Sequence, residues 1–234
     1  FARGGFLAEH AYPAQLIAMI FSDVPGNDIE FIASGPTVRD QTTIHDARAV
    51  LQEYKAKIGL TFDFENLIET PKEEKYFLNV YNNLVATNTI ALNAMQKKAE
   101  MLGMHATIVT ESLTGEARDA GLQILSELHR APKHTAVLYG GETTVTVRIA
   151  GKGGRNQELA LSALREINEG EIVIPFASDG HDNTDSAGGI CDSVTRAHAM
   201  ERNLDIEEYL QNNRSYDFFS ITGDRIMTGD TGSN

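Results

Sequence analysis

A glycine-rich segment, residues 151–157 (GKGGRNQ), lies between a predicted strand and a predicted helix. In that position backbone N–H groups and a helix N-terminus converge on an anion. Arg155 adds a guanidinium that can grip a phosphate or carboxylate with two hydrogen bonds, which lysine cannot do. The G-x-G-x-x-G and Walker A patterns do not fit, because Asn156 and Gly153 stand at the deciding positions. The segment therefore predicts an anion site; a plain connecting loop is the alternative.

An acidic loop, residues 178–185 (SDGHDNTD), follows a predicted buried strand. It carries three carboxylates, Asp179, Asp182 and Asp185, within seven residues. Ligands of open α/β sheets bind beyond the carboxyl ends of strands, and carboxylates without cysteine suit Mg²⁺. The alternative is an Asx-rich turn. His181 is either a general base or a solvated loop histidine.

Two further groups of polar residues follow predicted strands. Asp23 stands in a turn-like stretch after the apolar run 16–21, as a ligand or base or as part of ordinary turn chemistry. Glu142, with Thr143 and Thr144 after it, follows two glycines. The threonine hydroxyls can serve an anion, although threonine in a strand needs no such role.

The elements that position these residues alternate between strands and helices, which indicates α/β layers. Expected strands cover residues 16–21, 105–109, 136–139, 143–149, 171–177, 218–222 and 225–227, with a hairpin or tight corner at 140–142. Expected helices cover 43–54, 88–102, 117–128, 155–167 and 194–210, the last one broken near Asn203. We expect layered sheets with helices on both faces, in two Rossmann-like or related domains, 1–132 and 133–234.

Composition excludes several classes of protein. The 234 residues carry 33 Asp and Glu against 20 Lys and Arg, a net charge of −13, which argues against nucleic-acid binding but not against a small anionic substrate. One cysteine, which we interpret as a packing residue, excludes an internal disulfide and favours a reducing, cytoplasmic location. The run 16–21 is far shorter than the about 20 residues of a membrane helix.

Taken in order, several segments together resemble the type-2 glycerate kinases, whose C-terminal part is a MOFRL domain. The matching segments are 3–5 (RGG), 22–26 (SDVPG), 33–37 (ASGPT), 108–110 (IVT), 115–117 (GEA), 140–147 (GGETTVTV), 151–158 (GKGGRNQE), 178–180 (SDG), 184–185 (TD), 223–224 (GD) and 228–229 (TG). They span almost the whole chain, which corresponds to about the C-terminal half of a typical member.

The resemblance implies ATP-dependent phosphorylation of D-glycerate to 2-phosphoglycerate, with ATP and Mg²⁺ as cofactors and the active site in a cleft between two domains. The implied partners are glycerate and a nucleotide, with no nucleic acid and no membrane, and a homo-oligomer is compatible with it. The implied catalytic residues are Arg155, Asp179 and Asp185. The implied magnesium ligands are Asp179, Asp182 and Asp185. The implied substrate or nucleotide contacts are Gly153, Gly154, Asn156, Gln157, Glu142, Thr143, Thr144, Asp23 and Ser34.

The chain departs from the family pattern at Asn183, where a glycine-containing pair is usual, and at Asp230, where proline is common. The family's lysine-containing, glycine-rich N-terminal segment has no match here, so we expect a fragment of a longer polypeptide. Two other functions remain open. One is a hydroxypyruvate reductase, which needs a nicotinamide site; the other is a non-catalytic binding domain that has kept the fold.

Overall fold

The computed structural model describes residues 2–22, 24–59 and 66–232. Its contacts divide the chain into two compact units, Phe1–Thr87 and Asn88–Asn234. The domain boundary expected near residue 132 falls inside the second unit, just before a strand, and it stays a prediction. None of the described helices is long and apolar enough to cross a membrane.

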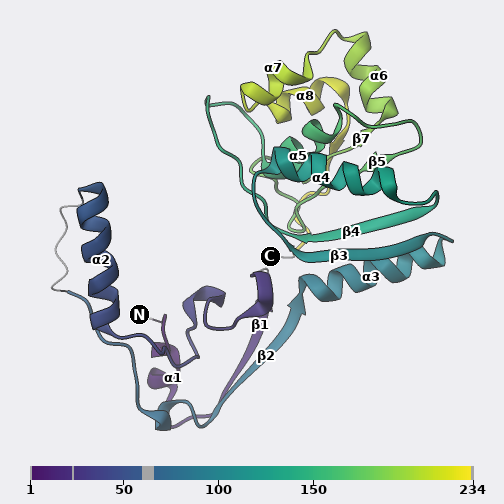
Figure 1. Ribbon diagram of the computed structural model, residues 1–234. Coiled ribbons are helices and arrows are strands. Elements are labelled where there is room, and N and C mark those ends of the chain that lie inside the picture. Colours follow the sequence, from purple (N-terminus) through teal and green to yellow (C-terminus); the bar gives the residue numbers. More distant parts are fainter. Residues whose placement is uncertain (1, 23, 60–65, 233–234) are drawn as a thin grey trace. The chain divides into compact units, whose positions relative to one another are not determined.

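The first unit contains one pair of parallel strands, β1 and β2 (Figure 1). A helix precedes the first strand, and a second helix lies between the two strands along the chain. In chain order its elements are α1 (Phe6–Ala11), β1 (Leu16–Ser22), the 3₁₀ turns Pro25–Asn27 and Ile32–Ser34, α2 (Ile44–Ile58), the 3₁₀ turn Glu74–Tyr76 and β2 (Val80–Thr87). The strand expected at 16–21 is confirmed, but its expected burial is wrong. Ile17, Met19 and Phe21 are 62–72% exposed, because β2 is the one strand paired with β1 in the described part and alternate side chains face away from the packed side.

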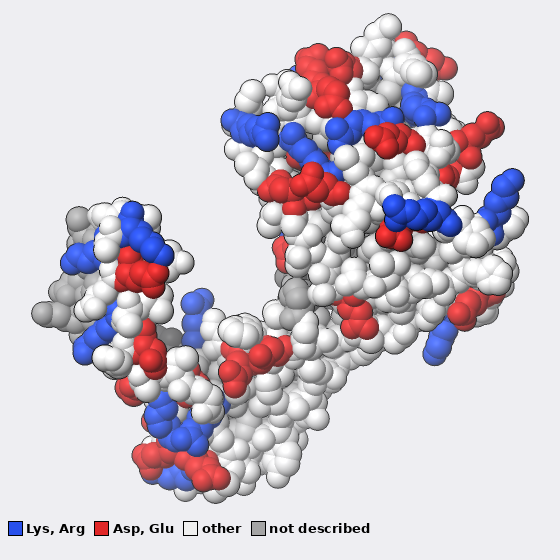
Figure 2. All heavy atoms as spheres, viewed as in Figure 1, with Lys and Arg blue, Asp and Glu red and all other residues white. Residues whose placement is uncertain are grey.

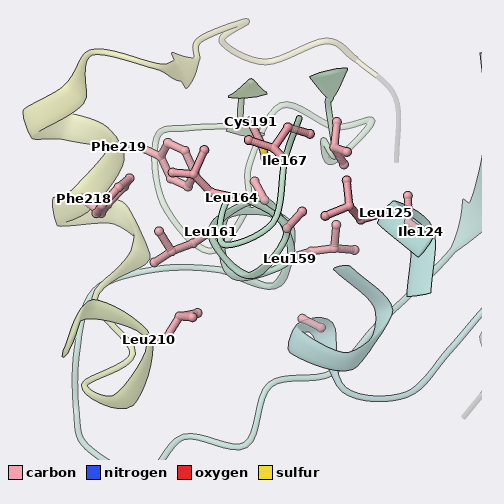
Figure 3. Close-up of a cluster of buried hydrophobic side chains, with 14 of the residues drawn as sticks. Ile124, Leu125, Leu159, Leu161, Leu164, Ile167, Cys191, Leu210, Phe218 and Phe219 are labelled. Carbon is pink, nitrogen blue, oxygen red and sulfur yellow. The ribbon is translucent and has the colours of Figure 1, made fainter. Parts of the chain in front are cut away.

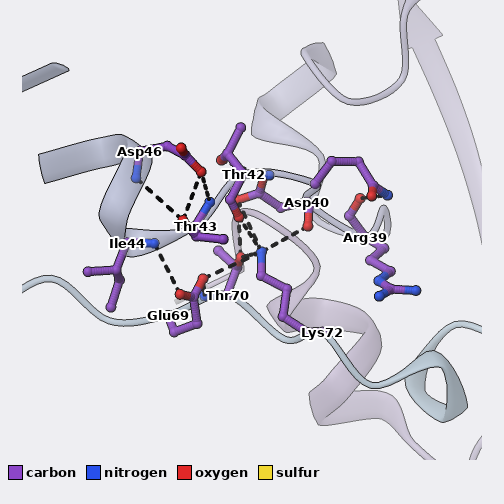
Figure 4. Close-up of polar contacts among 10 residues, drawn as sticks. Arg39, Asp40, Thr42, Thr43, Ile44, Asp46, Glu69, Thr70 and Lys72 are labelled. Carbon is purple, nitrogen blue, oxygen red and sulfur yellow. Dashed lines mark hydrogen bonds and ion pairs between the residues drawn. The ribbon is translucent and has the colours of Figure 1, made fainter. Parts of the chain in front are cut away.

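The start of α2 is anchored to the segment that precedes β2 (Figure 4). Lys72 donates through Nζ to the backbone carbonyl oxygens of Asp40, at 2.8 Å, and of Thr42. The Ile44 N–H donates to the Glu69 carboxylate at 3.0 Å. Glu69 therefore supplies a partner for an N–H group that the helix start leaves unpaired, and Lys72 holds the loop that leads into the helix.

The second unit is built on a parallel pair, β3 and β4, in which His105 pairs with Thr135 and Ile108 with Leu138. In chain order its elements are α3 (Asn88–Met101), β3 (His105–Leu113), α4 (Ala117–Arg130), β4 (Thr135–Gly141), α5 (Arg155–Ala163), β5 (Ile172–Val173), β6 (Gly188–Gly189), β7 (Cys191–Asp192), α6 (Ser193–Glu201), α7 (Ile206–Gln211), α8 (Ser215–Thr222) and β8 (Arg225–Ile226). Figure 1 shows α3 on one side of the β3–β4 pair and α4 with α5 on the other, which confirms the expected α/β class.

The hydrophobic core of this unit surrounds α5 (Figure 3). Its fully buried members include Leu125 from α4, Leu161 from α5 and Phe218 with Phe219 from α8. Cys191 belongs to the same cluster, as expected for a packing residue, and burial raises the pKa of its thiol. Because α5 is buried from Gln157 to Ala163, its first turn has a fixed position, and that turn carries the exposed Arg155.

Four expected elements of this unit differ from the structure. The strand expected at 143–149 is wrong, since an isolated bridge at Thr144 is all that this range forms. The hairpin at 140–142 is wrong: after Gly141 the chain continues beside β3, where Thr144 bridges Glu116 in the parallel direction. The strand expected at 218–222 is the helix α8, since burial of Phe218 and Phe219 outweighs their β propensity. The buried strand expected at 171–177 is reduced to β5 and one isolated bridge.

A buried polar network ties α5 to its neighbours. Glu158, 2% exposed, forms an ion pair with Arg118 of α4 at 2.5 Å and accepts a hydrogen bond from Asn213 Nδ2 at 3.2 Å. The Asn213 amide oxygen accepts the backbone N–H groups of Arg148 at 2.9 Å and Ile149 at 3.4 Å. The network thus joins the loop that leads into α5 to Glu158 on that helix, through Asn213.

Glu158→Gln removes the charge that compensates Arg118, so we expect it to lower the free energy of unfolding by about 3 kcal/mol, as for breaking a buried ion pair. The matched control is Glu166→Gln, at an exposed glutamate near the same helix, with an expected change within about 0.5 kcal/mol. Urea unfolding measures both. Equal midpoints for the two variants would show that the network does not stabilise the unit.

Candidate functional site

The first turn of α5 is capped by a carboxylate from the acidic loop. Asp182 accepts hydrogen bonds from the backbone N–H groups of Asn156, at 3.0 Å, and Gln157, at 2.8 Å. It also accepts from both side-chain amides, each at 3.1 Å, and it is 2% exposed. The expected convergence of N–H groups on an anion is present, but the anion is the chain's own Asp182. An external anion cannot use these two N–H groups while Asp182 holds them.

The glycines of this loop are required by close packing. A Cβ atom on Gly154 would lie 2.1 Å from the Asp182 carbonyl oxygen, and one on Gly153 would lie 2.2 Å from Ser215 Oγ. On Gly151 it would lie 2.3 Å from the Asn213 carbonyl oxygen. Any larger residue would push the segment away from α8 and the acidic loop. This requirement accounts for the glycines without a bound phosphate; their expected ligand contacts stay a prediction.

Arg155, the first residue of α5, forms an ion pair with Glu142. Its Nη1 lies 2.8 Å from Glu142 Oε1, and the two side chains are 42% and 52% exposed. Nη1 makes the one ion pair that Arg155 has among the described residues, so Nη2 and Nε remain available to a ligand. A half-exposed guanidinium beside a carboxylate can bind the acid group of a ligand while the carboxylate accepts from a neighbouring hydroxyl.

Glu142 reaches this position because the chain runs on past β4 alongside β3. Its N–H donates to the Leu113 carbonyl oxygen at 2.8 Å, and Gly141, at φ 135°, approaches Leu113 so closely that a Cβ would lie 2.3 Å from its nitrogen. Thr144 continues the ladder by donating its N–H to Gly115 at 2.8 Å, while Thr143 is buried. Glu142 therefore stands at the carboxyl end of a parallel pair, where α/β sheets bind ligands.

The three carboxylates of the acidic loop do not gather around one point. Among the described residues no group of three His, Cys, Asp or Glu side chains is arranged to hold a metal ion. Asp182 faces α5, Asp179 accepts the His181 N–H at 2.9 Å, and Asp185 lies 3.8 Å from Arg225 Nη1. A magnesium site with all three as ligands does not fit this arrangement; individual roles for Asp179 and Asp185 stay predictions.

Asp185 is held in its ionised form. A hydrogen bond from the Tyr216 hydroxyl lowers the pKa of this carboxyl, and the nearby charges of Arg225 and Lys152 lower it further. An efficient general base at neutral pH needs a pKa near that pH. The environment of Asp185 therefore favours a role for its charge over a role as proton acceptor.

His181 joins the acidic loop to the last described residues. Its Nε2 lies 2.5 Å from Asp230 Oδ1, and this hydrogen bond, with one to the Thr184 carbonyl, raises the pKa of the imidazole. Thr231 Oγ1 donates to the Ser178 carbonyl oxygen at 2.5 Å. The histidine thus has a partner and helps to hold the C-terminal segment, although it remains exposed.

Two expected site residues lie apart from this group. Asp23 is outside the described residues. Ser34 belongs to the first unit, where it lines a cavity of about 730 Å³ together with Arg3, Phe31 and Arg39. Ala33 and Ser34 have φ of 50° and 62°, a left-handed conformation that few non-glycine residues adopt.

The sequence also left residues of this region unrecognised. Tyr216 lies in no expected element and Arg225 in an expected strand, yet the Arg225 guanidinium donates to the Tyr216 hydroxyl at 2.6 Å beside Asp185. Glu158 offered one signal, a charged residue on a helix face that is otherwise apolar. Asn213 offered none, because the partners of its side chain lie at least 55 residues away along the chain.

The chain is similar to known protein families and to known proteins along almost its whole length. The MOFRL family model matches residues 135–234, and a domain of unknown function, DUF4147, matches residues 2–69. A glycerate 2-kinase of Pyrococcus horikoshii is 41% identical over 99% of this chain and 56% of its own length. A D-glycerate 2-kinase of Thermotoga maritima is 38% identical over 99% of this chain and 57% of its own length.

Solved structures agree with these sequence matches. The crystal structure of the Thermotoga maritima glycerate kinase superposes on 100% of this chain and 58% of its own with a TM-score of 0.86. A Pyrococcus horikoshii structure gives a TM-score of 0.80 over 100% of this chain and 57% of its own. The chain thus spans between half and three fifths of the length of these relatives. The chain belongs to the glycerate kinase family, and its residues 135–234 match the MOFRL model.

Proposed function

We propose that the complete gene product containing this chain uses ATP to phosphorylate the 2-hydroxyl of D-glycerate, yielding 2-phosphoglycerate and ADP. The Pyrococcus and Thermotoga relatives are a glycerate 2-kinase and a D-glycerate 2-kinase, which supports this substrate and position. The observation that carries the proposal is the Arg155–Glu142 pair, 2.8 Å apart, at the first turn of α5 and the carboxyl end of the β3–β4 pair.

The reaction needs positioning and charge neutralisation more than covalent chemistry. The 2-hydroxyl oxygen forms a bond to the γ-phosphorus, and the bond from that phosphorus to the bridging oxygen breaks with its electron pair going to ADP. The hydroxyl proton is released. A chain that fixes a guanidinium and a carboxylate on rigid elements meets the positioning requirement.

In this proposal Arg155 binds the glycerate carboxylate or the moving phosphoryl group through the nitrogens that Glu142 leaves available. Glu142 accepts a hydrogen bond from a glycerate hydroxyl. Asn156 and Gln157 serve mainly to hold Asp182, since their amides donate to it at 3.1 Å. The α5 start thereby presents Arg155 at a constant angle.

We propose Asp179 and Asp185 as magnesium ligands. Asp182 is buried and accepts hydrogen bonds from α5, so we do not assign it to the ion. When bound, the ion supplies charge neutralisation for the phosphate oxygens of the donor. Asp185 suits this role because its pKa is lowered by the Tyr216 hydroxyl. We also place the reaction in the cytoplasm, since the one cysteine is buried and unpaired.

An assay of the purified gene product with D-glycerate, ATP and Mg²⁺ tests the function directly. We expect glycerate-dependent formation of ADP and a product phosphorylated at the 2-position, which ³¹P NMR distinguishes from the 3-phosphate. A parallel assay with hydroxypyruvate and NADH or NADPH tests the reductase. Oxidation of the nicotinamide without glycerate-dependent ADP would overturn the kinase, and inactivity in both assays would favour a binding domain.

Arg155→Lys keeps the charge but removes the planar fork that grips an acid group at two points. We expect kcat/KM for glycerate to fall by about 100-fold, as for loss of one transition-state contact. Arg130→Lys, at an arginine whose side chain is 72% exposed on α4, is the matched control and should change nothing. Near-normal kcat/KM in Arg155→Lys would remove Arg155 from the mechanism.

Asp182→Asn and Asp179→Asn separate support from ligand contact. Replacing the Asp182 carboxylate places an amide donor against N–H groups, so we expect a loss of about 2 kcal/mol in the free energy of unfolding together with reduced kcat/KM. Asp179→Asn should reduce kcat/KM with a stability change within about 0.5 kcal/mol. If the two variants lose equal stability, Asp182 is not the structural cap of α5 that we describe.

A further inference from the structure

Lys152, Tyr216 and Arg225 form a cluster beside Asp185, apart from the Arg155–Glu142 pair. Lys152 Nζ lies 3.6 Å from the centroid of the Tyr216 ring. Arg225 lies 5.0 Å from the same centroid and donates to the Tyr216 hydroxyl at 2.6 Å. The cluster shares two segments with the Arg155–Asp182 site, because Lys152 precedes Arg155 and Asp185 follows Asp182 by three residues each.

The backbone of Lys152 is held in place by its neighbours on both sides. Gly151 and Gly153 on either side are packed against Asn213 and Ser215, with no room for a Cβ at either position. The Lys152 carbonyl oxygen accepts the Tyr216 N–H at 3.1 Å. The Cα atom of Lys152 therefore has a fixed position, which limits the region that its ammonium group can occupy.

The cluster carries an excess of positive charge. Two cations, Lys152 and Arg225, face one carboxylate, Asp185, and the described residues place no carboxylate within ion-pair distance of Lys152. The chain as a whole has a net charge of −13, and Figure 2 shows acidic and basic side chains interspersed over the visible face of the second unit. Two neighbouring cations that share one carboxylate keep a local excess of positive charge on this acidic body, which suits an anion.

The ring contact leaves Lys152 free to change partners. A cation–π contact at an exposed site is weaker than a charge-assisted bond from an ammonium to a phosphate oxygen. A phosphate arriving beside Tyr216 can therefore draw the ammonium from the ring. Arg225, held by the Tyr216 hydroxyl, is already in place to share that phosphate.

We propose that Lys152 and Arg225, arranged around Tyr216, form a phosphate subsite that binds the donor nucleotide, separate from the glycerate contact of Arg155. This assignment rests on the proposed function for the identity of the donor. Lys152 binds phosphate oxygens directly, and Tyr216 positions both cations. The subsite would leave the acceptor's acid group to Arg155.

The test compares Lys152→Ala, Lys152→Arg and Lys133→Ala in the complete gene product, the last as a control at an exposed lysine between α4 and β4. Isothermal titration measures binding of MgATP, MgADP, D-glycerate and 2-phosphoglycerate. We expect Lys152→Ala to weaken MgATP and MgADP about tenfold or more, the scale of one lost charged contact, with glycerate within twofold. Lys152→Arg should recover most of the nucleotide affinity, and Lys133→Ala should match the parent.

A second variant, Tyr216→Phe, keeps the ring and removes the hydroxyl that holds Arg225, and it should weaken MgATP less than Lys152→Ala does. Nucleotide affinities in Lys152→Ala equal to those of Lys133→Ala would overturn the subsite, as would a loss confined to glycerate. Weakening confined to 2-phosphoglycerate would assign the cations to the product's phosphate and would likewise overturn the donor assignment.

These outcomes are independent of the kinase assay. Lys152-dependent binding of MgATP by a protein that does not phosphorylate glycerate would keep the subsite and reject the proposed function. Normal kinase activity and normal nucleotide affinity in Lys152→Ala would reject the subsite and keep the proposed function. A parent protein that binds no nucleotide would reject both.

Discussion

Asp182 is buried at the start of α5, where its carboxylate accepts hydrogen bonds from two backbone N–H groups and two amides. A helix start leaves such N–H groups without partners inside the helix, and a negative charge placed there is stabilised by the helix dipole. The cap comes from a loop about 25 residues further along the chain. One carboxylate thus satisfies the helix and joins the acidic loop to the glycine-rich segment.

The other features of the site follow from that contact. Gly154 has to be glycine because the Asp182 carbonyl and carboxylate lie against its Cα. Asn213 holds the incoming loop through its amide oxygen, and Glu158, paired with Arg118, accepts a hydrogen bond from the Asn213 amide. Arg155 sits between these two supports. Its guanidinium is exposed while its backbone is fixed, which is the arrangement a binding residue needs.

Much of the second unit was predictable from sequence. The spacing of Ala117, Ile124 and Leu125 indicates the buried face of α4, and the start of α5 at Arg155 is confirmed. The helix α8 was not predicted, because Phe218 and Phe219 favour strands locally and only their burial against α5 makes the helix stable. The strand β2 was missed for a related reason, since its pairing with β1 joins segments 64 residues apart, as Leu16 with Val80 shows.

The site was predictable in part. The resemblance implies that residues of both loops serve one site, and the hydrogen bonds from Asn156 and Gln157 to Asp182 show that the two loops lie in contact. The role of Asp182 could not be predicted, because the sequence shows three similar carboxylates and does not indicate which one is buried. Burial separates them: Asp182 is buried, and Asp185 is exposed. A helix cap supplied from a distant loop leaves no local spacing signal.

The Arg155–Glu142 pair has a consequence for how an anionic ligand arrives. The pair is neutral as a unit, and it sits on a body with a net charge of −13, so no long-range attraction guides an acid toward it. At physiological salt, charges are screened beyond about 8 Å, which limits the repulsion as well. Encounter is then governed by diffusion, and discrimination among acids falls to contact geometry at the guanidinium once the ligand has arrived.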